Sequence, residues 1–169
     1  MAKMTSAEAA KLLRETKEEL ASLLQKEEMS NVFSAAVTED IESVRPEYDY
    51  ASTRKEQERI EARIREIKHA ISIFNARTLI PKFDMTVDQM LIYLPQLAEQ
   101  KARLQVMSNR LPKQRSRGIM SSANIIDYTY ANYDIPTVAK DYEKVSKRLA
   151  EAQTALDLVN TTKTLEIPE

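Results

Sequence analysis

Residues 60–74 read IEARIREIKHAISIF, and apolar residues recur in this stretch at alternating steps of four and three positions. A second stretch, between residues 138 and 159, repeats the same spacing. Apolar residues spaced in this way line one side of an α-helix, and that side needs another helix to cover it. The members of the two seams are Ile60, Ile64, Ile67, Ile71 and Phe74, and then Val138, Tyr142, Val145, Leu149, Ala152, Leu156 and Val159. The two seams predict helices that pack lengthwise on one another.

The composition agrees with a fold made of long helices. The 169 residues include 30% charged residues, a single glycine, no tryptophan and no cysteine. This balance is typical of solvated helices joined by few connectors. Without cysteine there is no disulfide and no thiolate metal site, so we expect a cytoplasmic protein. The chain shows no signal-peptide pattern and no run of about 18 apolar residues, so we expect no membrane segment. We expect residues 1–169 to form a single domain.

Capping signals predict where the first two helices begin. Thr5 with Glu8, and Thr53 with Glu56, match the capping box, in which two residues satisfy each other's backbone amides. Pro81 predicts that the second helix ends a few residues before it, because the residue before a proline avoids the helical conformation.

Prolines also mark the last two helices. The third helix is expected to begin at Asp84 or Thr86 and to end before Pro112. Pro95 lies inside it and removes one backbone hydrogen bond, so we expect a kink there or a regular helix that starts only after it. Pro136 suits the first turn of the fourth helix, where its missing amide hydrogen costs nothing.

The segments between the helices predict small β elements. Residues 30–50 form an irregular acidic connector, in which a short strand at residues 32–37 is expected. Residues 126–130 alternate as a strand does, and a β-hairpin insertion is expected over residues 113–133. The tail at residues 162–167 alternates again and is expected to pair with a strand edge. The predicted fold is mainly all-α: an antiparallel coiled coil or bundle of about four helices with a small β-hairpin insertion.

Charged residues are unevenly distributed along the chain. Residues 100–126 contain six basic residues and no acidic one, whereas residues 27–49 contain seven acidic residues against Arg45. The basic segment could bind the phosphates of a nucleic acid, or it could pair with the acidic segment, within the molecule or across a subunit interface. We favour the second interpretation and keep nucleic acid binding as the alternative.

The candidate interaction residues come from the basic segment and from the tyrosines that follow it. Tyrosine anchors interfaces well, because it joins a large apolar ring to a polar group. The alternation of Tyr128 and Tyr130 with polar residues also fits a strand that covers the end of the bundle, and we favour this second interpretation. The candidates are Arg110, Lys113, Arg115, Arg117, Tyr128, Tyr130 and Tyr133.

One spacing suggests a metal site. Glu66 and His69 form the Glu-x-x-His pattern that, on a helical bundle, can ligate a di-metal centre with carboxylates of other helices. The heptad pattern places both at outer positions, whereas such ligands point inward, so a di-metal bundle is our third interpretation and no metal ligand is assigned. Gly118 is the sole glycine, which excludes a P-loop and a dinucleotide-binding loop. We expect no catalytic residue, no cofactor and no enzymatic activity.

Four short motifs resemble a known family. They are Lys68-His69-Ala70-Ile71, Phe74-Asn75, Arg110-Leu111-Pro112 and Asn132-Tyr133-Asp134-Ile135. Together they resemble a family of small, uncharacterised bacterial helical proteins, some of which carry the label septicolysin. The resemblance implies a long antiparallel helical hairpin or bundle with a small β element, and the label implies a cytolysin. We do not infer lytic activity, because no segment has the basic amphipathic face or the apolar length of a membrane-inserting helix.

These patterns predict a structural or interaction protein that self-associates through long amphipathic helices. A helix of about 25 residues is roughly 38 Å long, and its flank stays exposed unless a second subunit covers it. We expect a homodimer or a larger assembly, and a separate protein partner if the chain is monomeric. The contact between subunits is expected to include the apolar stripe of the first or third helix. The seams of the second and fourth helices are expected to meet inside the subunit. We expect no membrane association.

Overall fold

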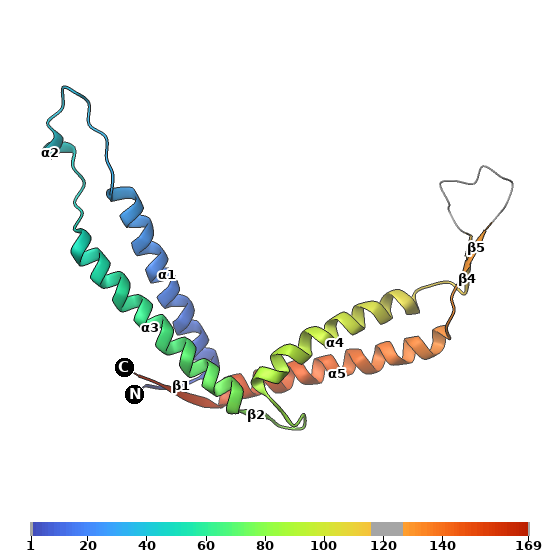
Figure 1. Cartoon of the computed structure of the whole chain (residues 1–169). Helices are drawn as coiled ribbons and strands as arrows, with labels where there is room; N and C mark the ends of the chain where they lie inside the picture. Colours follow the sequence, from blue (N-terminus) through green and yellow to red (C-terminus); the bar gives the residue numbers. More distant parts are fainter. Residues whose placement is uncertain (1, 116–126, 169) are drawn as a thin grey trace. The chain divides into compact units, whose positions relative to one another are not determined.

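The computed structural model describes residues 2–115 and 127–168 (Figure 1). They form the four long helices α1 (Ser6–Ser30), α3 (Tyr50–Arg77), α4 (Val87–Ser108) and α5 (Ile135–Thr162), and the short helix α2 (Ile41–Val44). The antiparallel strand pairs are β1 (Ala2–Thr5) with β6 (Thr164–Ile167), β2 (Leu79–Ile80) with β3 (Met85–Thr86), and β4 (Lys113–Arg115) with β5 (Tyr128–Tyr130). The prediction of a mainly α-helical fold with a small β-hairpin is confirmed.

The chain divides into two compact units. Unit 1 comprises residues 1–78 and 159–169, and unit 2 comprises residues 79–158. In unit 1, α1 packs against α3, and the β1–β6 pair lies at the ends of these helices. In unit 2, α4 and α5 run side by side and are joined by the β4–β5 pair (Figure 1). Each unit therefore rests on one pair of long helices.

The helix starts of unit 1 show which capping signals the chain uses. The Thr5–Glu8 capping box is confirmed, since the amide of Thr5 donates to Glu8 Oε2 at 2.7 Å and the amide of Glu8 donates to Thr5 Oγ1 at 3.2 Å. The predicted start of α3 at Thr53 is wrong. Asp49 caps this helix instead, because its carboxylate already accepts from the amides of the first turn, at 3.0 and 3.2 Å. Thr53 lies inside that turn.

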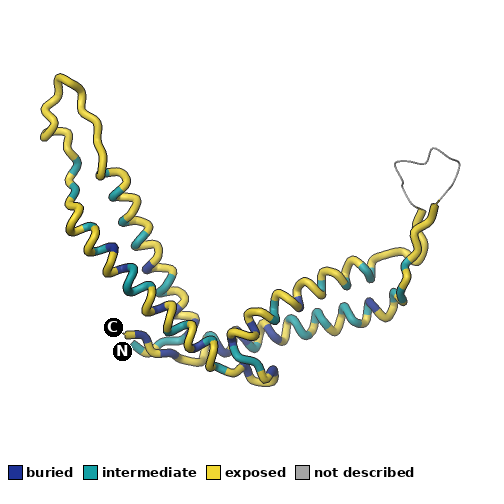
Figure 2. The backbone as a smooth tube through the Cα atoms, in the orientation of Figure 1, coloured by how far each residue is buried: buried dark blue, intermediate teal, exposed yellow. Residues whose placement is uncertain are grey.

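The heptad seam of α3 supplies the core of unit 1. Ile60, Ile67 and Phe74 are buried, whereas the alternate members of the seam are only half-buried (Figure 2). On the facing helix α1, the buried positions are the small residues Ser6, Ala9 and Thr16. Small residues at these points let the backbones of α1 and α3 approach closely. The helix that covers the α3 seam in unit 1 is thus α1, the preceding long helix of the chain. Contact between the seams of the second and fourth long helices stays a prediction.

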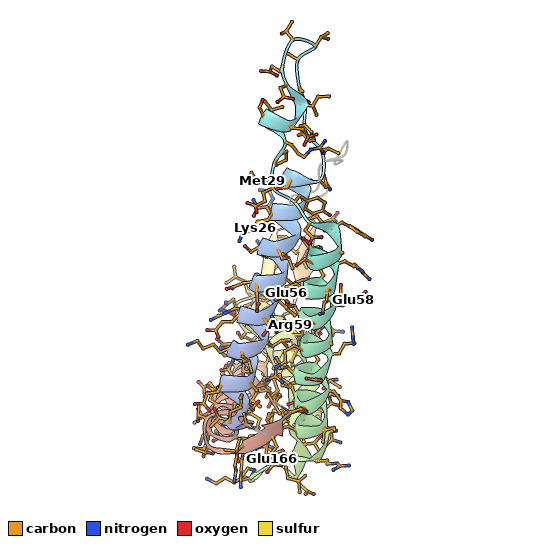
Figure 3. The ribbon with its side chains drawn as sticks, turned by 90° about the vertical axis from the view of Figure 1, so that its left-hand side faces the viewer. Lys26, Met29, Glu56, Glu58, Arg59 and Glu166 are labelled. Carbon is orange, nitrogen blue, oxygen red and sulfur yellow. The ribbon has the colours of Figure 1, made fainter. Side chains whose placement is uncertain are left out.

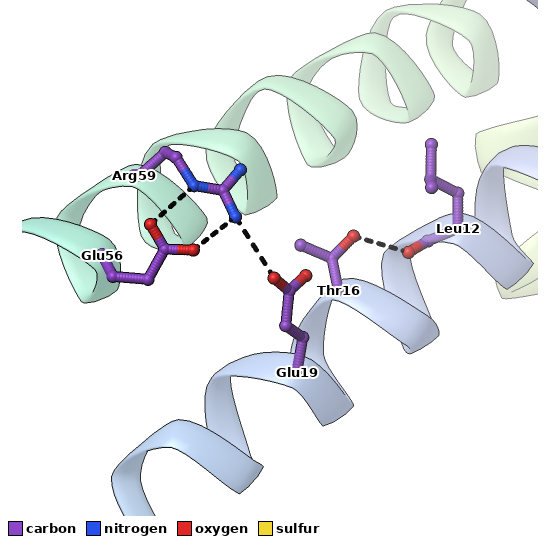
Figure 4. A network of polar contacts seen from close by, with 5 residues as sticks. All are labelled: Leu12, Thr16, Glu19, Glu56 and Arg59. Carbon is purple, nitrogen blue, oxygen red and sulfur yellow. Dashed lines mark hydrogen bonds and ion pairs between the residues drawn. The ribbon is translucent and has the colours of Figure 1, made fainter. Parts of the chain in front are cut away.

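A polar network joins α1 to α3 beside this core (Figure 4). The guanidinium of Arg59 donates to Glu56 of its own helix at 2.9 and 2.7 Å and to Glu19 of α1 at 3.2 Å. In α1 the hydroxyl of Thr16 donates to the carbonyl oxygen of Leu12 at 2.8 Å, which satisfies this hydroxyl in its buried position. The three charged side chains are largely exposed, so solvent screens their attraction and the apolar seam dominates stability.

The chain ends close unit 1. The tail strand β6 pairs with β1 in the register Ala2 to Ile167 and Thr5 to Thr164, which confirms the prediction that the tail pairs with a strand. Alternate residues Leu165 and Ile167 of β6 are buried, as expected of a strand with one covered face. The position of β1 was not predicted, although its residues Ala2–Thr5 alternate between apolar and polar as those of β6 do.

The connector between α1 and α3 is irregular, as predicted, apart from α2. The strand predicted at residues 32–37 is wrong: these residues have no regular structure and are exposed. A lone strand is not stable in water without a partner strand, and none of the strands in residues 2–115 and 127–168 pairs with this segment. The connector is tied down at its α3 end, where Glu27 accepts hydrogen bonds from the hydroxyl of Tyr48 at 2.7 Å and from the amide of the buried Gln57.

In unit 2, α4 begins directly after its N-cap Thr86, one of the two starting residues predicted from the sequence, and Thr86 forms a capping box with Gln89. The helix starts before Pro95 and continues through it, so the alternative of a start after the proline is wrong. Pro95 is exposed. It removes only one backbone hydrogen bond, and the turns on either side of it remain helical. The first turn of α5 contains Pro136, as predicted, and Asp134 Oδ2 accepts the amide of Thr137 at 2.9 Å.

The α5 seam is buried at its two ends and half-buried between them. Val138, Ala152, Leu156 and Val159 are buried, whereas Leu149 in the middle of the helix is half-buried. The predicted seam, of which Leu149 is a member, is therefore only partly buried. One neighbouring helix covers a seam from one side, whereas full burial in a bundle needs helices on both flanks.

Candidate interaction surfaces

The β4–β5 pair forms a ribbon with a basic and aromatic face, which we call the basic ribbon. Lys113 lies opposite Tyr130 and Arg115 lies opposite Tyr128. Directly opposite residues of an antiparallel pair share a face, so the two bases and the two tyrosines lie together. The ammonium of Lys113 confirms this, since it lies 4.1 Å from the ring centroid of Tyr128 and 5.5 Å from that of Tyr130. All four side chains are exposed.

A shallow pocket of about 430 Å³ lies against the basic ribbon and includes Arg110, Arg115 and Tyr130 in its lining. The guanidinium groups offer several N–H donors to a carboxylate or a phosphate. The tyrosine ring, 61% exposed, offers a flat apolar face for stacking. The ribbon is therefore equipped to hold an anionic group next to a flat ring.

The structure brings together most of the predicted interaction residues. Arg110, Lys113, Arg115, Tyr128 and Tyr130 lie on the basic ribbon or at its base. Arg117 lies outside the described residues. Tyr133 is half-buried, and its hydroxyl donates to the carbonyl oxygen of Met107 at 2.9 Å, which ties the end of α4 to the segment before α5. Tyr133 thus has a structural contact in addition to its predicted role.

The acidic connector, residues 31–49, combines exposed carboxylates with exposed apolar side chains. Arg45 donates to both carboxylate oxygens of Glu42, at 2.9 and 2.7 Å, and lies 5.1 Å above the ring of Phe33. The hydrogen bond from Arg45 lowers the pKa of Glu42. Exposed apolar side chains near this segment begin with Met29 at the end of α1 (Figure 3) and continue with Val32, Val37 and Ile41. Contact between this segment and the basic ribbon, within one copy of the chain or between two copies, stays a prediction.

An apolar surface on α4 faces away from the buried side of that helix, and we call it the outer stripe. Its members are Leu91, Ile92, Pro95, Ala98, Ala102 and Val106, and all are exposed. At about 100° per residue, four of them fall on the side opposite the buried Met90 and Leu97, whereas Leu91 and Ala98 lie on the flank of the helix between the two sides. Among the six members, Ile92 and Val106 are 59% and 60% exposed. This stripe was not predicted from the sequence, although its apolar residues recur mostly at steps of three and four.

The Glu-x-x-His pair lies on the exposed side of α3. Glu66 pairs with Arg63 at 3.3 Å, and Glu66 and His69 line a groove of about 690 Å³ between α3 and β6. Across residues 2–115 and 127–168, no cluster of three or more histidine, aspartate or glutamate side chains could hold a metal ion. No helix among the described residues is long and apolar enough to cross a membrane.

Comparisons with known proteins bear on the fold of the chain. No family model matches the chain, and no curated protein matches it. Among solved structures, the chain is similar to the crystal structure of a functionally unknown conserved protein from Corynebacterium diphtheriae. The TM-score is 0.62 at 19% sequence identity, and the match covers 98% of this chain and 100% of the other. The resemblance to the septicolysin-labelled family stays a prediction.

Proposed function

We propose that this protein is an interaction protein that self-associates through the outer stripe of α4. One observation carries the proposal: α4 has two apolar faces, and its own unit buries only the one that contains Met90 and Leu97. Contiguous exposed apolar surface bounded by polar residues is typical of protein contact sites.

We also propose a cytoplasmic location, which the absence of cysteine supports.

The shape of the outer stripe favours a second copy of the same chain as its partner. Large side chains lie at its two ends, Leu91 and Ile92 at one and Val106 at the other, and Ala98 and Ala102 lie between them. Two such stripes in antiparallel orientation place the large residues of one copy against the opposite end of the other, while the alanines allow close approach at the centre. This arrangement has the two-fold symmetry that most homodimers adopt. The stripe spans about 22 Å, at 1.5 Å per residue.

Light scattering coupled to size-exclusion chromatography tests the proposal. We expect a mass of at least twice 19.4 kDa at micromolar concentration. Ala102→Glu places a charge on the outer stripe and should give a monomer. The matched control, Gln100→Glu, adds the same charge to an exposed position of α4 outside the stripe and should leave the mass unchanged. A parent protein that stays monomeric over a wide concentration range, or equal effects of both variants, would contradict self-association through α4.

A second candidate function, nucleic acid binding, is favoured by the basic ribbon. A two-stranded ribbon fits the major groove of DNA, and exposed tyrosines stack on unpaired bases. Fluorescence anisotropy titrations at several salt concentrations test this function. In the double variant Lys113→Gln with Arg115→Gln, the slope of log K against log salt should become less negative by about 2, because two phosphate contacts are lost. The control pair, Lys11→Gln with Arg14→Gln on exposed positions of α1, should leave the slope unchanged. Binding that is absent at about 150 mM salt or insensitive to the ribbon variant would exclude this function.

A further inference from the structure

A groove of about 600 Å³ lies in unit 2 between the β2–β3 turn, residues 81–84, and one face of α5. We call it the turn groove. On α5 its lining extends from Lys147 to Leu158, which corresponds to about 16 Å at 1.5 Å per residue. It has no part in the outer stripe of α4 or in the basic ribbon, so it is a separate surface feature.

The backbone of the turn is held in an unfavourable conformation. Lys82 and Asp84 have φ angles of 69° and 50°, in the left-handed region that residues with a side chain seldom adopt. This conformation directs Phe83 inward, where it is 8% exposed and the guanidinium of Arg148 lies 4.0 Å from its ring centroid. Strained backbone of this kind persists where the surrounding structure holds it, and it often accompanies binding sites.

The lining of the turn groove between its two ends is mostly apolar. Phe83, Ala150, Ala155 and Leu158 contribute to it, and Glu151 and Thr154 lie between the two alanines on α5. The hydroxyl of Thr154 donates to the carbonyl oxygen of Ala150 at 3.0 Å, so this polar group is already satisfied by the helix. This part of the lining therefore suits an aliphatic group better than a polar one.

Positive charge collects at one end of the turn groove. Lys82 on the turn and Lys147 and Arg148 on α5 all belong to the lining, whereas Glu151 is its single acidic residue. Among the described residues, none of the three bases has a carboxylate within ion-pair distance. An anionic group at this end would accept charge-assisted hydrogen bonds from these basic side chains, which no carboxylate of the described residues pairs with.

We propose that the turn groove binds an anionic amphiphile, with its carboxylate held by Lys82, Lys147 and Arg148 and its aliphatic chain lying along α5 towards Leu158. The charge of the bases selects the head group, and the apolar part of the lining selects the chain. This site is independent of self-association, since the outer stripe of α4 contributes nothing to it.

Titration calorimetry with decanoate, below the concentration at which it forms micelles, tests the proposal on the full chain. We expect one saturable site per chain and a rise in melting temperature, because the ligand binds only the folded state. Acetate, which lacks the chain, and decanol, which lacks the charge, should each bind at least tenfold more weakly. Shortening decanoate to octanoate should weaken binding by up to about 15-fold, the limit for two fully buried methylene groups. Decyl phosphate shows whether a phosphate head group serves as well as a carboxylate.

Three variants separate the site from a general effect of charge or apolar surface. Lys82→Gln with Lys147→Gln should weaken decanoate binding at least tenfold, whereas the control Lys140→Gln, on an exposed position of the same helix, should not change it. Ala150→Leu should block the groove while the melting temperature without ligand stays the same, because this position is exposed. Equal binding of decanol and decanoate, or equal losses in the control and the double variant, would overturn the proposal. The proposal would also be overturned if an acidic peptide with the sequence of residues 31–49 bound to the protein while decanoate did not. That result would make the turn groove a docking site for a second copy of the chain.

Discussion

Replacing Ile67 with alanine tests the seam that decides the fold of unit 1. Ile67 lies in the middle of α3 and has no exposed surface. The substitution shortens its side chain by three carbon atoms and leaves the helix propensity favourable, since alanine is the best helix former. Any loss of stability therefore comes from packing and not from the helix itself.

The expected loss follows from the burial. Three buried carbon groups at about 0.8 kcal/mol each correspond to about 2.4 kcal/mol of lost transfer free energy. The cavity left against α1 adds a further cost, so the total should fall between about 2.5 and 4 kcal/mol. The matched control is Ile73→Ala, the same substitution on the same helix at a side chain that is 39% exposed. Its cost should stay below about 1 kcal/mol.

Urea denaturation followed by circular dichroism measures both variants at one protein concentration, because self-association shifts apparent stability. With a slope of about 2 kcal/mol per molar urea, Ile67→Ala should move the midpoint down by about 1 M or more. The midpoint of Ile73→Ala should move by less than half of that. Equal shifts for the two variants would refute the assignment of Ile67 to the core and with it the register of α3 on α1.

Three further predictions concern the helix ends, the connector and α5. Thr5→Ala removes the cap that the structure shows with Glu8 and should cost about 1 kcal/mol, measured by the same denaturation. The hydrogen bond to Glu27 raises the pKa of Tyr48 to about 12, so the stabilisation from this phenol is complete below its ordinary pKa near 10 and is lost as pH rises through about 12. Absorbance of the phenolate should show one tyrosine titrating last, and Tyr48→Phe should remove that step; an unchanged titration would contradict the contact. Leu149→Ala should cost less than Ile67→Ala, because Leu149 is half-buried; a larger cost would mean that its surroundings are more closed than the structure shows.

Local signals in the sequence were reliable where a few neighbouring residues decide the outcome. The capping box of Thr5 and the cap at Thr86 depend on side chains three residues away, and both are present. The start of α3 was misplaced, because Asp49 and Thr53 both suit a cap and the earlier one adds a turn of helix. The strand at residues 32–37 failed for a different reason. Its β-branched residues favour a strand, but a strand needs a partner, and local sequence contains no information on that.

The candidate surfaces were predictable in part. The run of bases and the alternating tyrosines placed a charged hairpin at residues 113–133, and the register then put Lys113, Arg115, Tyr128 and Tyr130 on one face. The turn groove was not predictable. It depends on the positive φ angles of Lys82 and Asp84 and on the position of a short turn against α5, to which no sequence pattern points.

The sequence by itself determined the helices, because heptad spacing, caps and prolines act within a few turns of the chain. It also determined the separation of charge, since the acidic and basic segments are contiguous runs. Which helix covers which seam was decided only by the tertiary structure. Many apolar seams are chemically alike, and only the chain connections choose between them, so α3 packs on α1. The tertiary structure alone also shows that α4 keeps a second apolar face exposed, because burial of a residue depends on what lies beside its helix.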